Sequence, residues 1–185
     1  FGLWAGNEQL GLFLLSLFHA LLLSFSFGIV LTYLTARVGV PFNLSIVLTL
    51  FVALVPAYGR LSMSVVKDLT FMPFYLLWLV MYIEYIRRIV GKIKISSRFC
   101  CTFVMLSILC MLTRKIAFYI LLFCFLSLLI FVKRKIITLL FLATIIAVQI
   151  LVPKIVFPVL HVEPAGTQEV IAIPLQQSAG ILIEH

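Results

Sequence analysis

Apolar residues along the chain gather into six runs, which cover residues 10–34, 44–58, 69–86, 99–112, 116–132 and 136–152. Polar segments separate the runs, and some of them contain glycine or proline, which end helices. The segment after the first run, for example, contains Gly39 and Pro41. A helix needs about 20 apolar residues to cross a bilayer, and a longer run crosses it with some tilt. The pattern therefore predicts an all-α fold, a polytopic transmembrane bundle of about six spans within residues 1–152.

Two neighbouring runs, 99–112 and 116–132, are shorter than a usual span, and only Thr113, Arg114 and Lys115 separate them. We interpret them as a tight hairpin of two antiparallel helices. After the last run, residues 153–185 are mixed in polarity and contain four of the seven prolines. They predict the start of a truncated extracytoplasmic segment. Because the chain begins at Phe1 rather than at methionine, we expect it to be an internal piece of a longer protein.

Composition supports lipid as the solvent of this chain. Apolar residues make up 64% of it, charged residues only 11%, and the mean hydropathy is +1.28. A soluble domain usually carries about 25% charged residues. The net charge of +8 does not indicate a nucleic-acid partner, because the basic residues form short clusters between apolar runs rather than a basic face. The four cysteines lie inside apolar runs without the spacing of a metal site, so we expect them to pack as small apolar residues.

The basic clusters also predict an orientation. The segments 35–43, 87–98 and 133–135 hold one, five and three of the 14 lysine and arginine residues. Cytoplasmic loops of membrane proteins carry an excess of these residues. We therefore predict a multi-pass protein of the cell membrane, in contact with membrane lipid, with these three segments in the cytoplasm and both ends of the chain outside it.

Two polar residues within the apolar runs have structural and functional interpretations. His19 lies on one helical stripe with Gln9, Ser16 and Ser26, and polar groups at membrane depth face a wet cavity or another helix. His19 therefore lines a substrate cavity or makes an interhelical hydrogen bond. Glu84 precedes Arg87 and Arg88 by three and four residues, the spacing of side chains that meet on a helix, which predicts a structural ion pair.

Charged residues near the other helix ends carry the remaining candidate chemistry. Asp68 precedes the run 69–86, so its carboxylate either caps that helix or faces an external cavity, where it holds a metal ion or a sugar hydroxyl. Arg114 and Lys115 lie at the external tip of the predicted hairpin. They either anchor it to lipid phosphates or bind the phosphate of a lipid-linked donor.

Three stretches carry a family resemblance: residues 66–71, residues 112–114 with Tyr119, and residues 173–179. Their order and separation resemble a family of unknown function of polytopic membrane proteins from Gram-positive bacteria. That family is in turn similar to the GT-C superfamily of membrane glycosyltransferases. The resemblance implies transfer of a sugar from a polyprenyl-phosphate donor to a cell-envelope acceptor. The chain departs from the family pattern at Ala117, where a glycine is expected, and at Gly180, where an arginine is expected.

The resemblance also implies roles for single residues. Asp68 matches the second acidic position of the superfamily and Arg114 the donor-side arginine, whereas the first external loop, where another carboxylate is expected, lies mostly upstream of Phe1. Asp68 is the predicted catalytic residue, and the predicted substrate-binding residues are His19, Arg114, Lys115, Tyr119, Gln176 and Gln177. No metal ligands are assigned. The identity of any cofactor is left open, and a divalent cation is one candidate. Two alternatives remain beside the transferase: a membrane transporter or flippase, and a non-catalytic membrane assembly protein.

Overall fold

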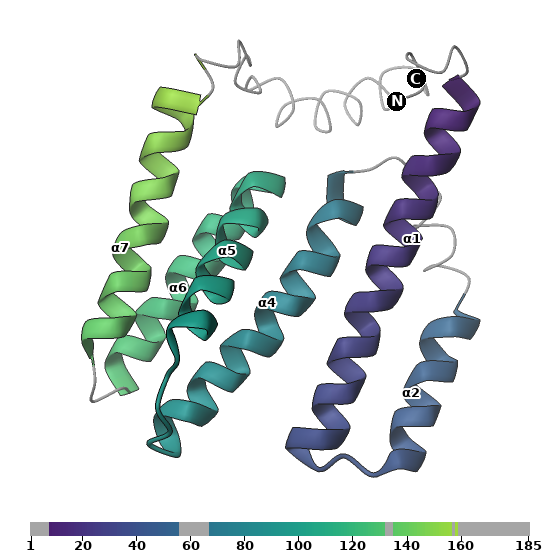
Figure 1. Cartoon of the computed structure of the whole chain (residues 1–185), viewed down its shortest axis with the longest axis horizontal. Helices are drawn as coiled ribbons and strands as arrows, with labels where there is room; N and C mark the ends of the chain where they lie inside the picture. The colour runs from purple at the N-terminus through teal and green to yellow at the C-terminus, as the bar shows by residue number, and fades with distance from the viewer. Residues whose placement is uncertain (1–7, 56–66, 132–134, 157, 159–185) are drawn as a thin grey trace, which may run out of the picture. The chain divides into compact units, whose positions relative to one another are not determined.

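The computed structural model describes residues 8–55, 67–131, 135–156 and 158, and within them every regular element is a helix (Figure 1). The α-helices are α1 (Glu8–Tyr33), α2 (Phe42–Leu54), α4 (Lys67–Val90), α5 (Ser97–Thr113), α6 (Lys115–Phe131) and α7 (Lys135–Leu151). Two π-helical segments, η1 (Leu34–Val38) and η2 (Val152–Val156), continue α1 and α7. The predicted all-α class is confirmed for these residues.

The chain divides into two compact units, residues 1–145 and 146–185. Unit 1 contains α1, α2, α4, α5, α6 and the first part of α7, up to Ile145. In the second unit, the described residues complete α7 and form η2. Most of the predicted extracytoplasmic segment, from residue 159 onward, lies outside the described residues. All contacts discussed below belong to unit 1.

Three of the described helices are long and apolar enough to cross a membrane, judged by length and composition. They cover Gln9–Val38, Leu69–Val90 and Lys135–Ile155. The other three, Phe42–Leu54, Ser97–Thr113 and Lys115–Ile130, are apolar but shorter. A 17-residue helix such as α5 extends about 26 Å, slightly less than the roughly 30 Å of a bilayer core. Three of the six predicted spans are thus helices of spanning length.

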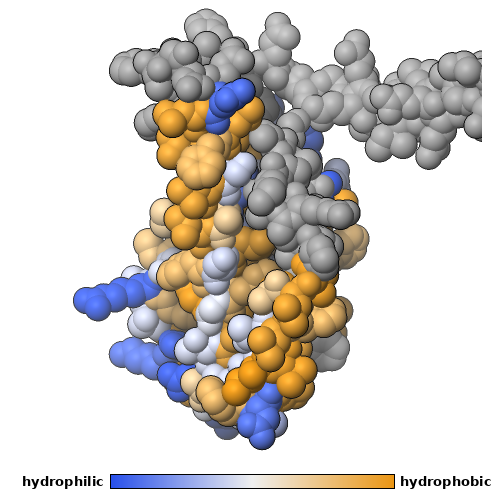
Figure 2. Space-filling view, turned by 90° about the vertical axis from the view of Figure 1, so that its right-hand side faces the viewer, coloured by the Kyte–Doolittle hydropathy of each residue, from blue (hydrophilic) through white to orange (hydrophobic). Residues whose placement is uncertain are grey.

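Large apolar side chains remain exposed along most of the described helices, Phe123 on α6 being 68% exposed. Figure 2 shows the side of unit 1 that carries α1 and α2, and its surface is mostly hydrophobic. Contiguous exposed apolar surface of this kind marks contact with a membrane or a partner protein. It agrees with the membrane association that the three long helices indicate.

Two helix ends differ from the predicted runs for identifiable reasons. The second run was predicted to reach residue 58, but α2 ends at Leu54 and Val55 is extended, with φ −74° and ψ 112°. Val55 precedes Pro56, and the residue before a proline is disfavoured in the helical conformation. The third run was predicted to end at residue 86, but α4 continues to Val90. Ion pairs from Arg87 and Arg88 back to Glu84 hold this last part of the helix together.

The helices α1 and α4 run parallel in a constant register. His19 on α1 lies 3.0 Å from the hydroxyl of Thr70 on α4, and the Tyr33 hydroxyl donates to Glu84 at 3.2 Å. Both bonds join residues that are 51 positions apart. A constant offset along two helices requires that they point the same way, so α4 begins at the same end of unit 1 as α1.

One face of α4 forms the aromatic core of unit 1. Trp78 is fully buried and stacks on Tyr75, Tyr82 and Phe103, with ring centroids 5.9, 5.0 and 5.8 Å away. The ring of Phe125 on α6 meets Trp78 edge-on, and Phe141 on α7 contacts Phe103. Aromatic rings at these separations attract one another beyond the area they bury. The core therefore joins α4 to α5, α6 and the first part of α7.

Three polar atoms on the aromatic face of α4 reach three different neighbouring helices. The Trp78 indole donates to Ser107 on α5 at 2.9 Å, and the Tyr82 hydroxyl donates to the Cys124 carbonyl on α6 at 3.0 Å. The Tyr85 hydroxyl lies 2.8 Å from that of Thr138 on α7. A buried polar group in an apolar medium is costly unless it is bonded. These bonds therefore specify which residues of α5, α6 and α7 lie against α4.

The predicted break at residues 113–115 is confirmed. Arg114 ends α5 in an extended conformation, with φ −151° and ψ 129°, and its N–H donates to the Cys110 carbonyl. Helix α6 begins at the next residue, Lys115, and the Ala117 N–H donates to the Arg114 carbonyl at 3.1 Å. The two helices pack against each other and run in opposite directions (Figure 1).

Candidate functional site

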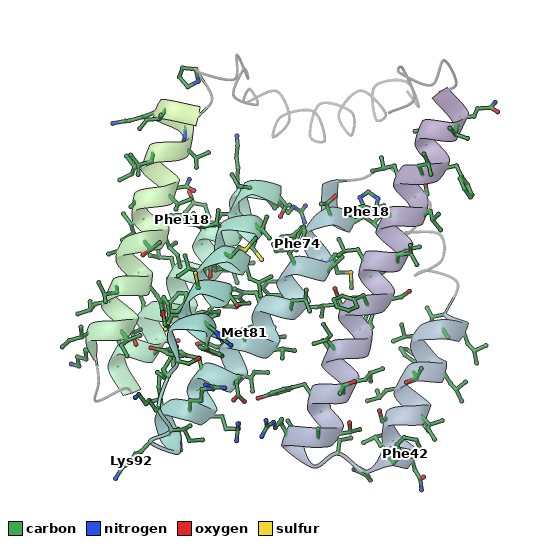
Figure 3. All side chains as sticks on the ribbon, in the orientation of Figure 1. Phe18, Phe42, Phe74, Met81, Lys92 and Phe118 are labelled. Atoms are coloured by element: carbon green, nitrogen blue, oxygen red, sulfur yellow. The ribbon has the colours of Figure 1, made fainter. Side chains whose placement is uncertain are left out.

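The direction of the helices brings the predicted site residues to one end of unit 1. Helix α5 is antiparallel to α4, because Trp78 bonds Ser107 while Arg88, further along α4, lies over Phe99, earlier in α5. The first turn of α4, which contains Asp68, therefore lies at the same end as Arg114. We call this the Arg114 end. Figure 3 shows Phe18, Phe74 and Phe118 in the half of unit 1 nearer this end, and Lys92 at the opposite end.

His19 joins the Arg114 end through Thr70. The imidazole is only 4% exposed, and its Nε2 lies 3.0 Å from the Thr70 hydroxyl, two positions after Asp68 in the chain. The contact is the interhelical hydrogen bond that was one of the two interpretations of this histidine. It places His19 beside the first turn of α4. The substrate-binding role of His19 stays a prediction.

The cations of the Arg114 end are accessible. Arg114 and Lys115 are both exposed, at the C-terminal end of α5 and the first position of α6. Tyr119, one turn further along α6, is also exposed, and its ring meets that of Phe118 edge-on at 5.3 Å. Ala117 is fully buried, which explains a small side chain at the position where the resemblance expects glycine. Guanidinium and ammonium groups at a helix junction are the donors that a phosphate would require.

Several predicted residues are not placed by the structure. Asp68 lies in the first turn of α4, but its side chain is outside the described residues, and so are Gln176, Gln177 and Gly180. Within the described part of the chain, no group of three or more histidine, cysteine, aspartate or glutamate side chains is arranged to hold a metal ion. The structure thus brings His19, Arg114 and Lys115 to the same end of unit 1 as the backbone of Asp68.

The opposite end of unit 1 contains the ion-paired cluster predicted around Glu84. This carboxylate is 8% exposed and accepts two bonds from Arg87, at 2.7 and 2.8 Å, and one from Arg88 at 2.9 Å. The predicted structural ion pair is confirmed. Sequence reasoning missed two further contacts, the bond from Tyr33 to Glu84 and the position of the Arg88 guanidinium 4.6 Å above the Phe99 ring. Both link other helices to α4, so the cluster ties α1, α4 and α5 together.

Together these features define a protein whose described regular elements are all helices, three of them long and apolar enough to cross a membrane. The chain belongs to a family of unknown function, DUF6020, whose model matches residues 2–185. No curated protein and no solved structure matches the chain. The predicted membership of a family of unknown function is thereby confirmed. The bacterial source and the similarity to GT-C glycosyltransferases stay predictions.

Proposed function

We propose that this chain is a multi-pass membrane segment of a glycosyltransferase that takes a sugar from a polyprenyl-phosphate donor. The Arg114 end is its proposed site and faces the extracytoplasmic side. The observation that carries the proposal is the position of three elements at this same end: the first turn of α4 with Asp68, the α5–α6 junction with Arg114, and His19 bonded to Thr70. The resemblance of the motifs around Asp68 and Arg114 to GT-C transferases supports the assignment.

The proposed chemistry uses the charges of this end. The Asp68 carboxylate accepts the proton of an acceptor hydroxyl, whose oxygen then forms the new bond to the anomeric carbon of the sugar. The bond from that carbon to the phosphate oxygen breaks, and the polyprenyl phosphate leaves with the electron pair. Arg114 offers a bidentate fork to the phosphate, and Lys115 adds a second positive charge. Tyr119, Gln176 and Gln177 are proposed contacts of the sugar and acceptor.

The bonding of Glu84 also supports this choice. At the opposite end, Glu84 is already bonded to two arginines and a tyrosine, so its carboxylate serves packing rather than proton transfer. The proposed orientation puts that end in the cytoplasm, because Arg37, Lys92, Lys94 and Arg98 gather there with Arg87 and Arg88. The Arg114 end then faces outward, where envelope acceptors lie.

The test is sugar transfer by the full-length protein in vesicles that contain a polyprenyl-phosphate-linked radiolabelled hexose. Asp68→Asn should abolish release of polyprenyl phosphate, because asparagine keeps the shape of the side chain but cannot accept the proton. Arg114→Gln should raise the KM for the donor about tenfold or more, since a charge-assisted hydrogen bond contributes about 1.5–3 kcal/mol. Lys67→Gln, a charge change beside Asp68, is the matched control and should leave both parameters unchanged.

The same vesicles separate the transferase from a transporter. Movement of the labelled donor between leaflets without release of polyprenyl phosphate would contradict the transferase and favour a flippase. Full transfer activity in Asp68→Asn would show that this carboxylate does not act as the base. In that case the favourable charge of a carboxylate in the first turn of α4 would account for the residue, and the proposed site would lose its catalytic group.

A further inference from the structure

A surface groove runs along α1 and η1 at the end of unit 1 opposite Arg114. It has a volume of about 500 Å³, and its wall includes Phe25, Gly28 and Ile29 of α1 together with Val80 of α4. At one end it reaches Tyr33, Ala36 and Arg37. The groove is therefore apolar along α1 and has a guanidinium at its mouth.

The dimensions of the groove match one leaflet of a bilayer. From Phe25 to Tyr33 the α-helix rises eight residues, or about 12 Å at 1.5 Å per residue, and the π-helical residues up to Arg37 extend the groove further. Half of a bilayer core of roughly 30 Å is about 15 Å. Residues 9–38 form one of the helices of spanning length, so Arg37 lies at its end, at the level of lipid headgroups. A phospholipid whose acyl chain lies along the groove would thus place its phosphate beside Arg37.

Charge around the mouth favours an anionic headgroup. Tyr33 lines the groove and donates to Glu84, the carboxylate that is already bonded to Arg87 and Arg88. One negative charge therefore faces two guanidinium groups, and Arg37 adds a further positive charge nearby. The Thr32 hydroxyl donates to the Gly28 carbonyl at 2.7 Å, so it is satisfied within its own helix. The local excess of positive charge attracts an anionic lipid and repels the cationic part of a zwitterionic one.

We propose that this groove binds one anionic glycerophospholipid, with an acyl chain against Gly28 and Ile29 and the phosphate at Arg37. The site is separate from the proposed transferase site, because it lies at the other end of unit 1, and it does not depend on catalytic activity. A bound lipid would cover apolar surface of α1 and α4 and join α1 to the arginine cluster on α4.

Gly28 offers a direct way to fill the groove. A Cβ atom placed on Gly28 meets no other atom within 4 Å, so a side chain there extends into open space. Gly28→Leu should therefore occupy the groove without displacing protein atoms, and leucine is also a better helix former than glycine. Ala53→Leu adds the same kind of bulk at an exposed position of α2 away from the groove and is the matched control.

The experiment is native mass spectrometry of the purified protein titrated with palmitoyl-oleoyl phosphatidylglycerol or the matching phosphatidylcholine. The unchanged protein should bind phosphatidylglycerol about fivefold more tightly or better, and Arg37→Gln should remove about a fivefold factor of that preference. Lys94→Gln, an exposed cation outside the groove, should keep it. Gly28→Leu should reduce binding of both lipids, whereas Ala53→Leu should not. Far-ultraviolet circular dichroism of every variant checks that its helices are intact.

Three results would overturn the proposal. Equal binding of the two lipids by the unchanged protein would remove the anionic preference. Phosphatidylglycerol binding that survives Gly28→Leu would place the lipid elsewhere. Displacement of the lipid by inorganic phosphate would show that Arg37 takes a soluble phosphate, because a lipid held by its acyl chain is not displaced by a headgroup fragment alone.

Discussion

Trp78→Ala should destabilise unit 1 by about 3 kcal/mol or more. Removing a buried tryptophan or phenylalanine side chain costs about 3–5 kcal/mol in soluble proteins, where the hydrophobic effect contributes. Lipid weakens that contribution, because apolar surface lost from a helix contact is still covered by apolar chains. The ring contacts of Trp78 with α5 and α6 are direct packing, however, and lipid chains replace them poorly. The lower end of the range is therefore expected.

The hydrogen bond of Trp78 contributes the smaller share. Trp78→Phe keeps a ring in the core but removes the donor to Ser107. Interhelical hydrogen bonds in membrane proteins contribute about 0.6 kcal/mol on average and about 1.7 kcal/mol at most. Ser107 also donates to the Phe103 carbonyl at 2.8 Å, so its hydroxyl keeps a partner when the indole is lost. We expect a loss of about 1 kcal/mol for Trp78→Phe.

The measurement is unfolding in mixed micelles, followed by far-ultraviolet circular dichroism because Trp78 is itself a fluorophore. Phe123→Ala removes an aromatic side chain that is 68% exposed on α6 and is the control, with an expected change below about 0.5 kcal/mol. A double-mutant cycle with Ser107→Ala isolates the hydrogen bond. If Trp78→Ala were no more destabilising than Phe123→Ala, the aromatic face of α4 would not be the core of unit 1.

Two further predictions concern the ion pairs of Glu84 and the orientation of the chain in the membrane. Glu84→Gln should destabilise the protein more than Tyr33→Phe, because the glutamine leaves Arg87 and Arg88 without their shared carboxylate. Tyr33→Phe removes one neutral donor and should cost less than about 1 kcal/mol. Equal losses of stability in micelle unfolding would contradict a central role for the ion pairs. On a background without the four native cysteines, Lys115→Cys should react with an impermeant thiol reagent on intact cells and Lys92→Cys only after permeabilisation, and the reverse pattern would invert the proposed orientation.

The helix positions were largely predictable because each apolar run ends in a physical signal. Basic residues follow the runs 69–86 and 116–132, and α6 ends at Phe131. The break at Arg114 was predictable for the same reason, since two cations interrupt otherwise continuous apolar sequence. The early end of α2 followed a signal that the run-based prediction overlooked, the restriction that Pro56 imposes on Val55. Local sequence was therefore sufficient for these elements.

The helix contacts could not be predicted in the same way. In a chain this apolar, most faces of most helices are hydrophobic, so periodicity does not show which face meets protein and which meets lipid. The offset of 51 residues between α1 and α4 depends on His19 finding Thr70 and Tyr33 finding Glu84. Thr70 and Tyr33 gave no separate signal, because threonine and tyrosine are common in membrane helices for other reasons. The sequence therefore identified His19 and Glu84 as candidates, but not Thr70 and Tyr33, the residues to which they bond.

The parallel register of α1 and α4 connects the two proposals. The His19–Thr70 bond lies near the Arg114 end, and the Tyr33–Glu84 bond lies beside the mouth of the groove, so the same helix pair contributes to both sites. Sliding α1 by one turn along α4 would break both bonds together. A lipid bound at Arg37 would oppose such a slide, since it contacts α1 and lies against Val80 of α4. If both proposals hold, lipid binding at one end stabilises the register on which the position of His19 at the other end depends.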